Sequence, residues 1–304
     1  MWLSFALATT LMWGLAELFY KKGAQETETY AHLKTCIFVG ICMGLHAGFT
    51  LLVEDVGYDW SNLWRYLPVS ACYILSMALS FFGMRFIEES ISDPIENTSG
   101  ALCTLLCVLI LGDRVSAPTW ICIGVIVAGI LGIGFLEHRD ESHRSSRLGK
   151  TMAAVAFCMP FCYAVLDALG SFLDVYYLED VAATPLAGVT EENIEEVANI
   201  SYELTFAFAA LLLFLFIKIK KVPLEIPKQG NKIMAAVCET AGQFTYVYAM
   251  RGNGAVAAPL ISSVCVVSLI LCRIFLKEKL TWKQYVFIAL VIAGILGLAI
   301  IEGE

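Results

Sequence analysis

The stretch Ala128-Gly129-Ile130-Leu131-Gly132 occurs a second time in this 304-residue chain, as Ala293-Gly294-Ile295-Leu296-Gly297. The two copies lie 165 positions apart, and the same shift aligns residues 94–137 with residues 259–302 at 11 identities in 44 positions. One constant offset over so long a segment favours an internal duplication over chance similarity between apolar sequences.

The two copies of this stretch lie in two of ten apolar segments, each about 20 residues long. The ten segments cover residues 2–20, 33–53, 64–84, 92–111, 117–136, 151–173, 201–217, 232–250, 254–276 and 283–301. A helix of about 20 apolar residues spans a bilayer, whereas the strands of a β-barrel would alternate apolar and polar residues. The composition agrees, since 59% of the residues are hydrophobic and 16% are charged, against roughly 25% charged in soluble domains. The sequence therefore predicts an all-α polytopic membrane protein with ten transmembrane helices.

The duplication divides these helices into two sets of five. We expect a first repeat over residues 1–137, a basic linker over 138–150 and a second repeat over 151–304. Because five is odd, the second repeat would enter the membrane in the opposite orientation. Inverted repeats of this kind occur in secondary transporters, where the substrate site lies between the repeats near the middle of the bilayer.

The basic residues predict the orientation of the bundle. Of the 20 Lys and Arg residues, 17 lie at connections on one side, and only Arg65, Arg114 and Arg251 lie on the other. The connection 174–200, on the second side, carries seven acids and no base. Because cytoplasmic loops carry the excess of bases, we predict a multi-pass protein of the inner or plasma membrane with both termini outside the cytoplasm.

Several segments resemble the drug/metabolite transporter superfamily, and in particular its EamA-type permeases. They are Leu11-Met12-Trp13-Gly14-Leu15 followed by Lys21-Lys22, and Gly252-Asn253-Gly254-Ala255-Val256-Ala257-Ala258-Pro259-Leu260 leading into Ile274-Phe275-Leu276-Lys277-Glu278-Lys279-Leu280-Thr281. The resemblance implies a two-repeat, ten-helix transporter that gives alternating access to a central cavity. Two features depart from the pattern: Gly100 and Cys265 stand where many relatives have proline, and many relatives are drawn with cytoplasmic termini.

Polar side chains inside the predicted helices are candidates for a solute or proton site, because such groups are costly in a bilayer. Glu239, Gln243 and Tyr246 follow one another at i, i+4 and i+7, which places them on one helix face. We predict that this stripe lines the cavity; the alternative is a polar contact between helices. Tyr73 is near the equivalent position in the first repeat.

A second group of candidates breaks the symmetry between the repeats. Glu96 and Asn97 reach into the fourth helix, and the matching positions of the second repeat hold Ile261 and Ser262. Unequal polarity in the two halves suits an asymmetric solute, so Glu96, Asn97 and Ser262 are included in the predicted site.

Three further ionisable residues have two interpretations each. Glu17 either reaches the membrane interface beside Lys21 or lines the cavity. Asp167, nearer the outer end of its helix, is a vestibule acid or a solvated helix end. His46 is either a hydrogen-bonded structural residue, which we favour, or a proton relay. Because acids outnumber bases among all the candidates, the cavity would favour cations or protons over anions.

Other classes of function lack support in the sequence. No Gly-rich nucleotide loop, H-E-x-x-H motif or nucleophile elbow occurs, so we predict neither an enzyme nor a cofactor. All eleven cysteines fall inside the predicted helices and suit packing, with no matching set of metal ligands. The net charge of −8 argues against nucleic-acid binding.

We therefore predict a secondary transporter, and more specifically an exporter, of a small organic metabolite, amino acid or cationic amphiphile. Protons are the candidate coupling ions, and the protein would act in the lipid bilayer as a monomer or homodimer. Two alternatives stay open. One is a divalent-cation permease of the same fold, and the other is a membrane-embedded protein that transports nothing.

Overall fold

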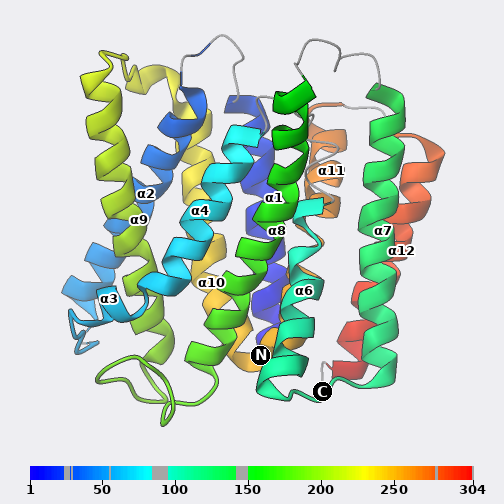
Figure 1. Cartoon of the computed structure of the whole chain (residues 1–304), viewed down its shortest axis with the longest axis horizontal. Helices are drawn as coiled ribbons and strands as arrows, with labels where there is room; N and C mark the ends of the chain where they lie inside the picture. The colour runs from blue at the N-terminus through cyan, green and yellow to red at the C-terminus, as the bar shows by residue number, and fades with distance from the viewer. Residues whose placement is uncertain are drawn as a thin grey trace.

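The computed structural model describes residues 1–23, 28, 30–54, 56–83, 95–141, 150–277 and 280–302, and within these ranges all regular structure is helical. The longer helices stand side by side, and the two termini lie at the same end of the bundle (Figure 1). The elements are α1 (Trp2–Gly23), α2 (Ala31–Val53), α3 (Asn62–Arg65), α4 (Leu67–Gly83), α6 (Ser99–Leu106), the π-helical turn η1 (Cys107–Leu111), α7 (Ala117–Glu141), α8 (Lys150–Leu178), α9 (Ile194–Ile219), the short 3₁₀ helix η2 (Ile226–Lys228), α10 (Gly230–Ile261), α11 (Val264–Phe275) and α12 (Trp282–Glu302).

Six of these helices are long and apolar enough to cross a bilayer: α1, α2, α7, α8, α9 and α12. The pair α10 and α11, bent by 51°, provides a seventh when it is counted as one span. Helix α4 and the segment from α6 through η1 are apolar but shorter within the described residues. The prediction of an all-helical, multi-pass membrane protein is thus confirmed, whereas ten spans in two inverted repeats stay a prediction.

The boundaries of α8 and α9 differ from the prediction. Helix α8 continues to Leu178 and α9 begins at Ile194, so the connection between them is shorter than the expected 174–200. Asp174, which we had assigned to that connection, lies in α8 with 0% of its surface exposed. Hydrogen bonds to this carboxylate permit its burial, and hydropathy along the chain does not detect them.

Helix α10 also differs, because it continues through the gap expected between residues 250 and 254. Asn253 has non-helical backbone angles (φ −168°, ψ 65°) and marks a kink, and the chain then stays helical to Ile261. Pro259 lies inside this last part and has no N–H to donate to the carbonyl of Ala255. The Thr104 hydroxyl of α6 donates to that carbonyl at 2.6 Å, so the bond lost to proline is replaced by one from a neighbouring helix.

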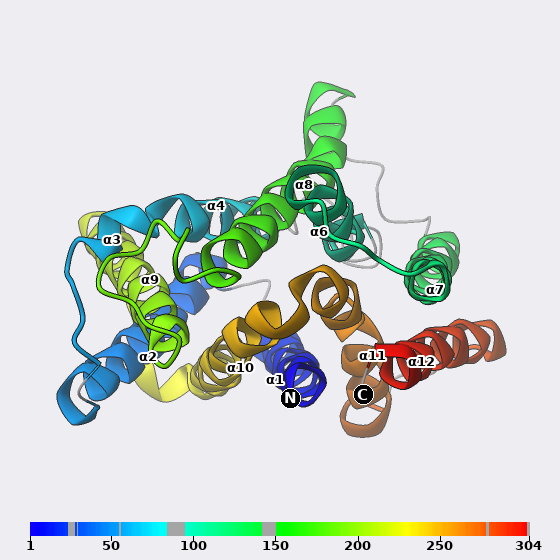
Figure 2. The same ribbon diagram turned by 90° about the horizontal axis from the view of Figure 1, so that it is seen from below.

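Four helix pairs dominate the packing: α1 with α10, α4 with α8, α2 with α9, and α7 with α12. Seen from below, α2 and α9 stand at one edge of the molecule and α7 and α12 at the other (Figure 2). The two remaining pairs lie between these edges, where α1 and α10 face α4 and α8 (Figure 2).

The repeated five-residue stretch lies in the contact between α7 and α12. A Cβ atom at Gly129 would collide with Val291, and one at Gly294 would lie 2.7 Å from Ile126. A glycine at each position therefore lets the helices approach closely. Gly124, in contrast, is exposed, and an added Cβ there would meet nothing within 4 Å.

We therefore expect Gly129→Ala to destabilise the protein by about 1–3 kcal/mol, because the added methyl group overpacks the contact with α12. Thermal unfolding of the purified protein in detergent would measure the change. Gly124→Ala is the matched control in the same helix and should be neutral or slightly stabilising. Equal melting temperatures for the two variants would contradict this account of the packing.

Candidate functional site

A cavity of about 660 Å³ lies between the two central layers of helices. Its walls come from α1, α2, α4, α8, α9, α10 and α11, together with α6 and the turn that precedes it. It reaches the end of the bundle where α1 ends and α2 begins, with Lys21, Glu28 and His32 in its lining. Its other limit is set by Tyr73 and Tyr246, in the interior of α4 and α10.

Nine of the ten predicted site residues line this one cavity. They are Glu17, Tyr73, Glu96, Asn97, Asp167, Glu239, Gln243, Tyr246 and Ser262. They come from five parts of the chain, which are α1, α4, the turn before α6, α8, and α10 with the residue that follows it, so the fold brings the candidates together.

His46 is the candidate that does not line the cavity. Its Nδ1 atom lies 2.8 Å from Oε1 of Glu203 on α9, and its ring packs edge-on against Phe244 at 5.4 Å. The pair joins α2 to α9, where a polar contact inside the membrane stabilises helix association. This position agrees with the structural interpretation of His46.

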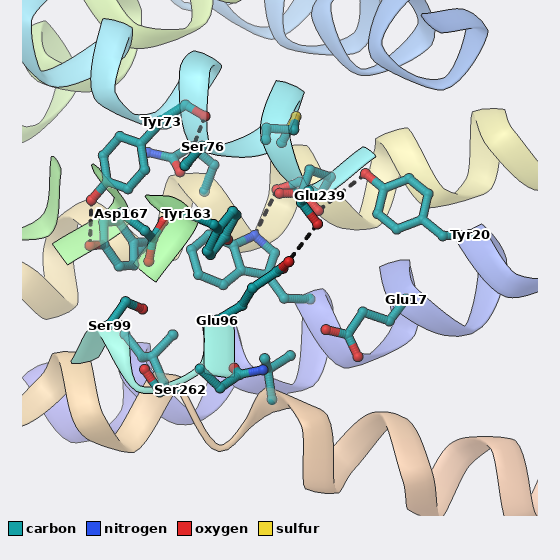
Figure 3. A pocket seen from close by; sticks show the side chains of 18 of the residues that line it. Glu17, Tyr20, Tyr73, Ser76, Glu96, Ser99, Tyr163, Asp167, Glu239 and Ser262 are labelled. Atoms are coloured by element: carbon teal, nitrogen blue, oxygen red, sulfur yellow. Dashed lines mark hydrogen bonds between the residues drawn. The ribbon is translucent and has the colours of Figure 1, made fainter. Parts of the chain in front are cut away.

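Glu239 lies where the faces of α1 and α10 meet. Its Oε2 atom accepts a hydrogen bond from the Tyr20 hydroxyl at 3.2 Å, and its backbone carbonyl accepts one from the Trp13 indole at 3.3 Å. The Trp13 ring packs against Tyr246 with 5.1 Å between centroids. Figure 3 shows the Tyr20 hydroxyl pointing at the Glu239 carboxylate inside the pocket. The carboxylate is thus held by a phenol, with aromatic rings beside it.

Asp167 forms a second acidic position in the cavity, on α8. Ser99 of α6 and Tyr163 of α8 line the cavity together with this carboxylate. Tyr163, Glu96 and Glu239 line the same cavity, and Figure 3 shows them around one pocket. The sequence had suggested a vestibule acid or a solvated helix end, but α8 extends to Leu178 and leaves Asp167 well inside the helix.

Glu96 and Ser262 lie where α6 meets the bend between α10 and α11. Ser80 donates to Oε2 of Glu96 at 2.9 Å, and the backbone N–H of Gly100 donates to Oγ of Ser262 at 3.1 Å. A Cβ atom at Gly100 would collide with Ser262 and with the carbonyl of Ala258. The glycine that departs from the family pattern therefore allows this close contact.

A hydrogen-bonded cluster closes the cavity at its inner limit, and we call it the floor. The Tyr73 hydroxyl donates to Oδ2 of Asp174 at 2.9 Å and lies 2.7 Å from the Tyr246 hydroxyl. Tyr246 donates to Oγ of Ser171 at 3.0 Å, and Tyr66 donates to Oδ1 of Asp174. The floor thus consists of Tyr66, Tyr73, Ser171, Asp174 and Tyr246, and it joins α4, α8 and α10.

Sequence reasoning missed most of the partners on α8, although a signal was present. Tyr163, Asp167, Ser171 and Asp174 recur at intervals of four, four and three residues. That spacing puts them on one helix face. The same spacing rule identified Glu239, Gln243 and Tyr246 on α10. It did not identify the residues of α8, because the predicted helix ended at residue 173 and α8 ends at Leu178.

A cluster of charged residues lies at the mouth of the cavity, whereas the floor is held mainly by hydroxyl groups. Glu28 lies 2.7 Å from Lys34 and 2.5 Å from Lys232, and its Oε1 atom also accepts from Gln229 at 2.9 Å. Burial alone would raise the pKa of the Glu28 carboxyl, but the hydrogen bonds from Lys232 and Lys34 outweigh it and lower the pKa to about 2. Both lysine side chains are buried, and the single Glu28 carboxylate offsets one of their two positive charges.

A smaller cavity of about 270 Å³ lies at the opposite end of the bundle, beside the kink in α10. Its lining includes Asp113, Arg114, Glu179, Arg251 and Asn253. The lining also contains Val175 of α8, next in sequence to Asp174 of the floor.

Comparison with known proteins agrees with this architecture. A family model described as the EamA-like transporter family matches residues 1–135 and 181–300, and no curated protein matches the chain. Among solved structures, 27 chains match. One crystal structure has a TM-score of 0.70 at 14% sequence identity and covers 97% of this chain and 95% of its own. At that identity, the likeness is one of fold alone.

For the mouth of the cavity, we expect Glu28→Gln to lower stability at pH 7 by roughly 3 kcal/mol, because two buried lysines lose their counter-charge. A lowered pKa stabilises the folded state above the ordinary value of 4.5, and this contribution is lost as the pH falls toward 2. Melting temperatures of wild type and variant should therefore converge over that range. Glu225→Gln, which removes an exposed pair with Lys228, is the control and should have little effect.

For the floor, we expect Tyr73→Phe to destabilise the protein by about 1–3 kcal/mol, since buried Asp174 and Tyr246 each lose a hydrogen-bond partner while the ring is kept. Thermal unfolding in detergent measures the change. Tyr285→Phe, at an exposed tyrosine of α12, is the matched control. A Tyr73→Phe protein as stable as this control would show that the floor contributes nothing to stability.

Proposed function

Because the chain belongs to the EamA-like transporter family, we propose that it is a secondary transporter of a small organic metabolite, amino acid or cationic amphiphile. The observation that carries the proposal is a cavity of about 660 Å³ that has several carboxyl and hydroxyl groups in its lining, reaches one end of the bundle and is closed by the floor. Transport by alternating access requires a central site that opens to one side of the membrane at a time.

Helix packing supports the proposal that the chain forms ten spans in two inverted repeats. If α1 corresponds to α8 and α4 to α10, exchanging the repeats converts the α1–α10 contact into the α8–α4 contact. The same exchange leaves α2–α9 and α7–α12 unchanged, because each of these pairs joins corresponding helices. All four contacts occur, as a two-fold relation between the repeats requires.

The charge count supports export as the direction. The cavity reaches the end of the bundle where Lys21, Lys34 and Lys232 lie, and by the distribution of bases that end is cytoplasmic. In this orientation, both termini are outside the cytoplasm and the cavity loads from the inside. Release then requires the floor to separate and the mouth to close.

Glu239 is the residue that we propose couples transport to protons. Its carboxylate reaches the cavity and accepts a hydrogen bond from Tyr20. A carboxylate away from bulk water is stable with either a bound proton or a bound cation. Solute loading from the cytoplasm would displace the proton, and a proton from the other side would displace the solute.

The alternative of a divalent-cation permease would need several oxygen ligands gathered around one ion. Within the described ranges, no group of three or more His, Cys, Asp or Glu residues could hold a metal ion. We therefore favour an organic solute.

Proteoliposomes loaded with a pH-sensitive dye would test this function. We expect wild type to change the internal pH when a panel of amino acids, aliphatic amines and quaternary ammonium ions is added. Glu239→Gln should abolish that response, because the amide cannot exchange a proton. Glu192→Gln, at an exposed residue of the 179–193 connection, is the control and should respond like wild type.

Two results would contradict the proposal in different ways. If no solute in the panel crosses the membrane with wild type, measured with radiolabelled compounds, the assignment as a transporter of this class is wrong. If Glu239→Gln keeps both the flux and its pH response, the proton role of Glu239 is wrong.

A further inference from the structure

The hydrogen-bond partners of the two deepest cavity acids indicate the charge of the solute. Asp167 shares the cavity lining with the hydroxyl groups of Ser99 and Tyr163, and Glu239 accepts a hydrogen bond from Tyr20. These neighbours are hydroxyl groups, which can donate to a carboxylate without neutralising its charge. In the part of the chain that the structure describes, neither acid has a Lys, Arg or His partner. The cavity therefore holds negative charge that a bound cation would balance.

Four hydroxyl groups of the lining already donate to the protein: Tyr20 to Glu239, Tyr73 to Asp174, Tyr246 to Ser171 and Ser80 to Glu96. An anionic solute would have to break these bonds to use those hydroxyls, whereas the Nε2 atom of Gln243, which also lines the cavity, has no hydrogen-bond partner among the described residues. A carboxylate, however, has about four positions that accept hydrogen bonds, so Asp167 and Glu239 can accept N–H donors from a solute without losing their own partners.

Aromatic rings supply the rest of the recognition surface. The rings of Trp13 and Tyr246 are 5.1 Å apart, and Tyr73 packs edge-on against Tyr202 at 5.7 Å. Tyr20 and Tyr163 line the same cavity (Figure 3). Aromatic faces attract ammonium groups and also bury apolar groups, and a cavity of about 660 Å³ has the size of sites for drug-sized molecules.

The described bases that line the cavity, Lys21 and His32, lie at its mouth. The Glu28 carboxylate there offsets one of the two positive charges of Lys34 and Lys232, and both of these lysines are buried. Asp167 and Glu239 lie deeper in the cavity, so a cation that has passed the mouth reaches two carboxylates that these bases do not pair with.

We propose that the transported solute is an organic cation, a protonated amine or quaternary ammonium ion with an apolar body. Its charged group pairs with Asp167 and Glu239, and its apolar part packs on Trp13 and Tyr246. This inference rests on the proposed function, and it makes the proton and the solute competitors for the same carboxylates.

Binding to the full-length protein in lipid nanodiscs tests the inference, with benzyltrimethylammonium as the probe. This ion keeps its charge at every pH, so any pH dependence belongs to the protein. Its uncharged carbon isostere, 2,2-dimethylpropylbenzene, and the anion benzenesulfonate are the matched ligands. We expect the cation to bind at least about tenfold more tightly than either, and its affinity to fall by up to about tenfold per pH unit on acidification.

Substitutions in the cavity test where the cation binds, and they separate the effect of side-chain charge from the effect of side-chain size. Glu239→Gln and Asp167→Asn keep the size of the side chain and should each weaken cation binding by about tenfold or more. Trp13→Leu should weaken it several-fold, and Trp13→Phe should retain part of the affinity. Glu192→Gln and Trp64→Leu, both exposed and outside the cavity, should bind like wild type. Melting temperatures identify any variant that is misfolded. If a variant is misfolded, the affinities of wild type for the cation, the uncharged isostere and the anion still test the proposal.

The outcomes separate this inference from the proposed function. Equal affinity of wild type for the cation and its isostere, or tighter binding of the anion, overturns the cation assignment. Flux of a neutral or anionic solute together with no binding of the cation overturns it as well, while transport stands. Cation binding that depends on Glu239 without any flux in proteoliposomes supports the site and contradicts the transporter.

Discussion

A carboxylate inside a bilayer must have hydrogen-bond donors, a counter-charge or water, and the interior of this protein is organised by that requirement. The acids that face the cavity or the floor are held by phenols and serine hydroxyls, as Glu239 is by Tyr20 and Asp174 by Tyr66 and Tyr73. These donors come from α1, from α4 and from Tyr66 just before α4, whereas the acids lie on α8, on α10 and in the turn before α6. Satisfying each acid therefore brings together helices that are distant in the sequence, and the cavity is the space among them.

The two ends of the cavity are held by different interactions. At the mouth, Glu28 bridges two lysines, and that contact depends on ionised groups. At the floor, hydroxyl groups share hydrogen bonds with each other and with Asp174. Hydroxyls rotate and both donate and accept, so the floor can exchange partners, or bind water in their place, without separating opposite charges. An end that must open and close during transport suits the second kind of bonding.

Much of this architecture could be predicted from the sequence because membrane burial leaves a strong signal in composition and spacing. The helical segments follow the apolar segments, and the i, i+4, i+7 rule placed Glu239, Gln243 and Tyr246 on the face that lines the cavity. Pairing across helices leaves no mark in a single segment, and this limit explains the placement of Asp174 and the unidentified partner of His46. Asp174 was assigned to a loop because its tyrosine partners are about 100 residues away. The gap expected near Asn253 is only a kink, since the chain stays helical on both sides of it. His46 could be placed in a helix but not opposite Glu203.

The bond from Thr104 to the carbonyl of Ala255 has a mechanical consequence. It fixes α6 to the part of α10 that lies beyond the kink at Asn253, and the contact between Gly100 and Ser262 adds a second attachment. One attachment point comes from each half of the chain, so the two segments form a unit that the break at Asn253 sets apart from the rest of α10. A displacement of either segment would therefore load both contacts at once.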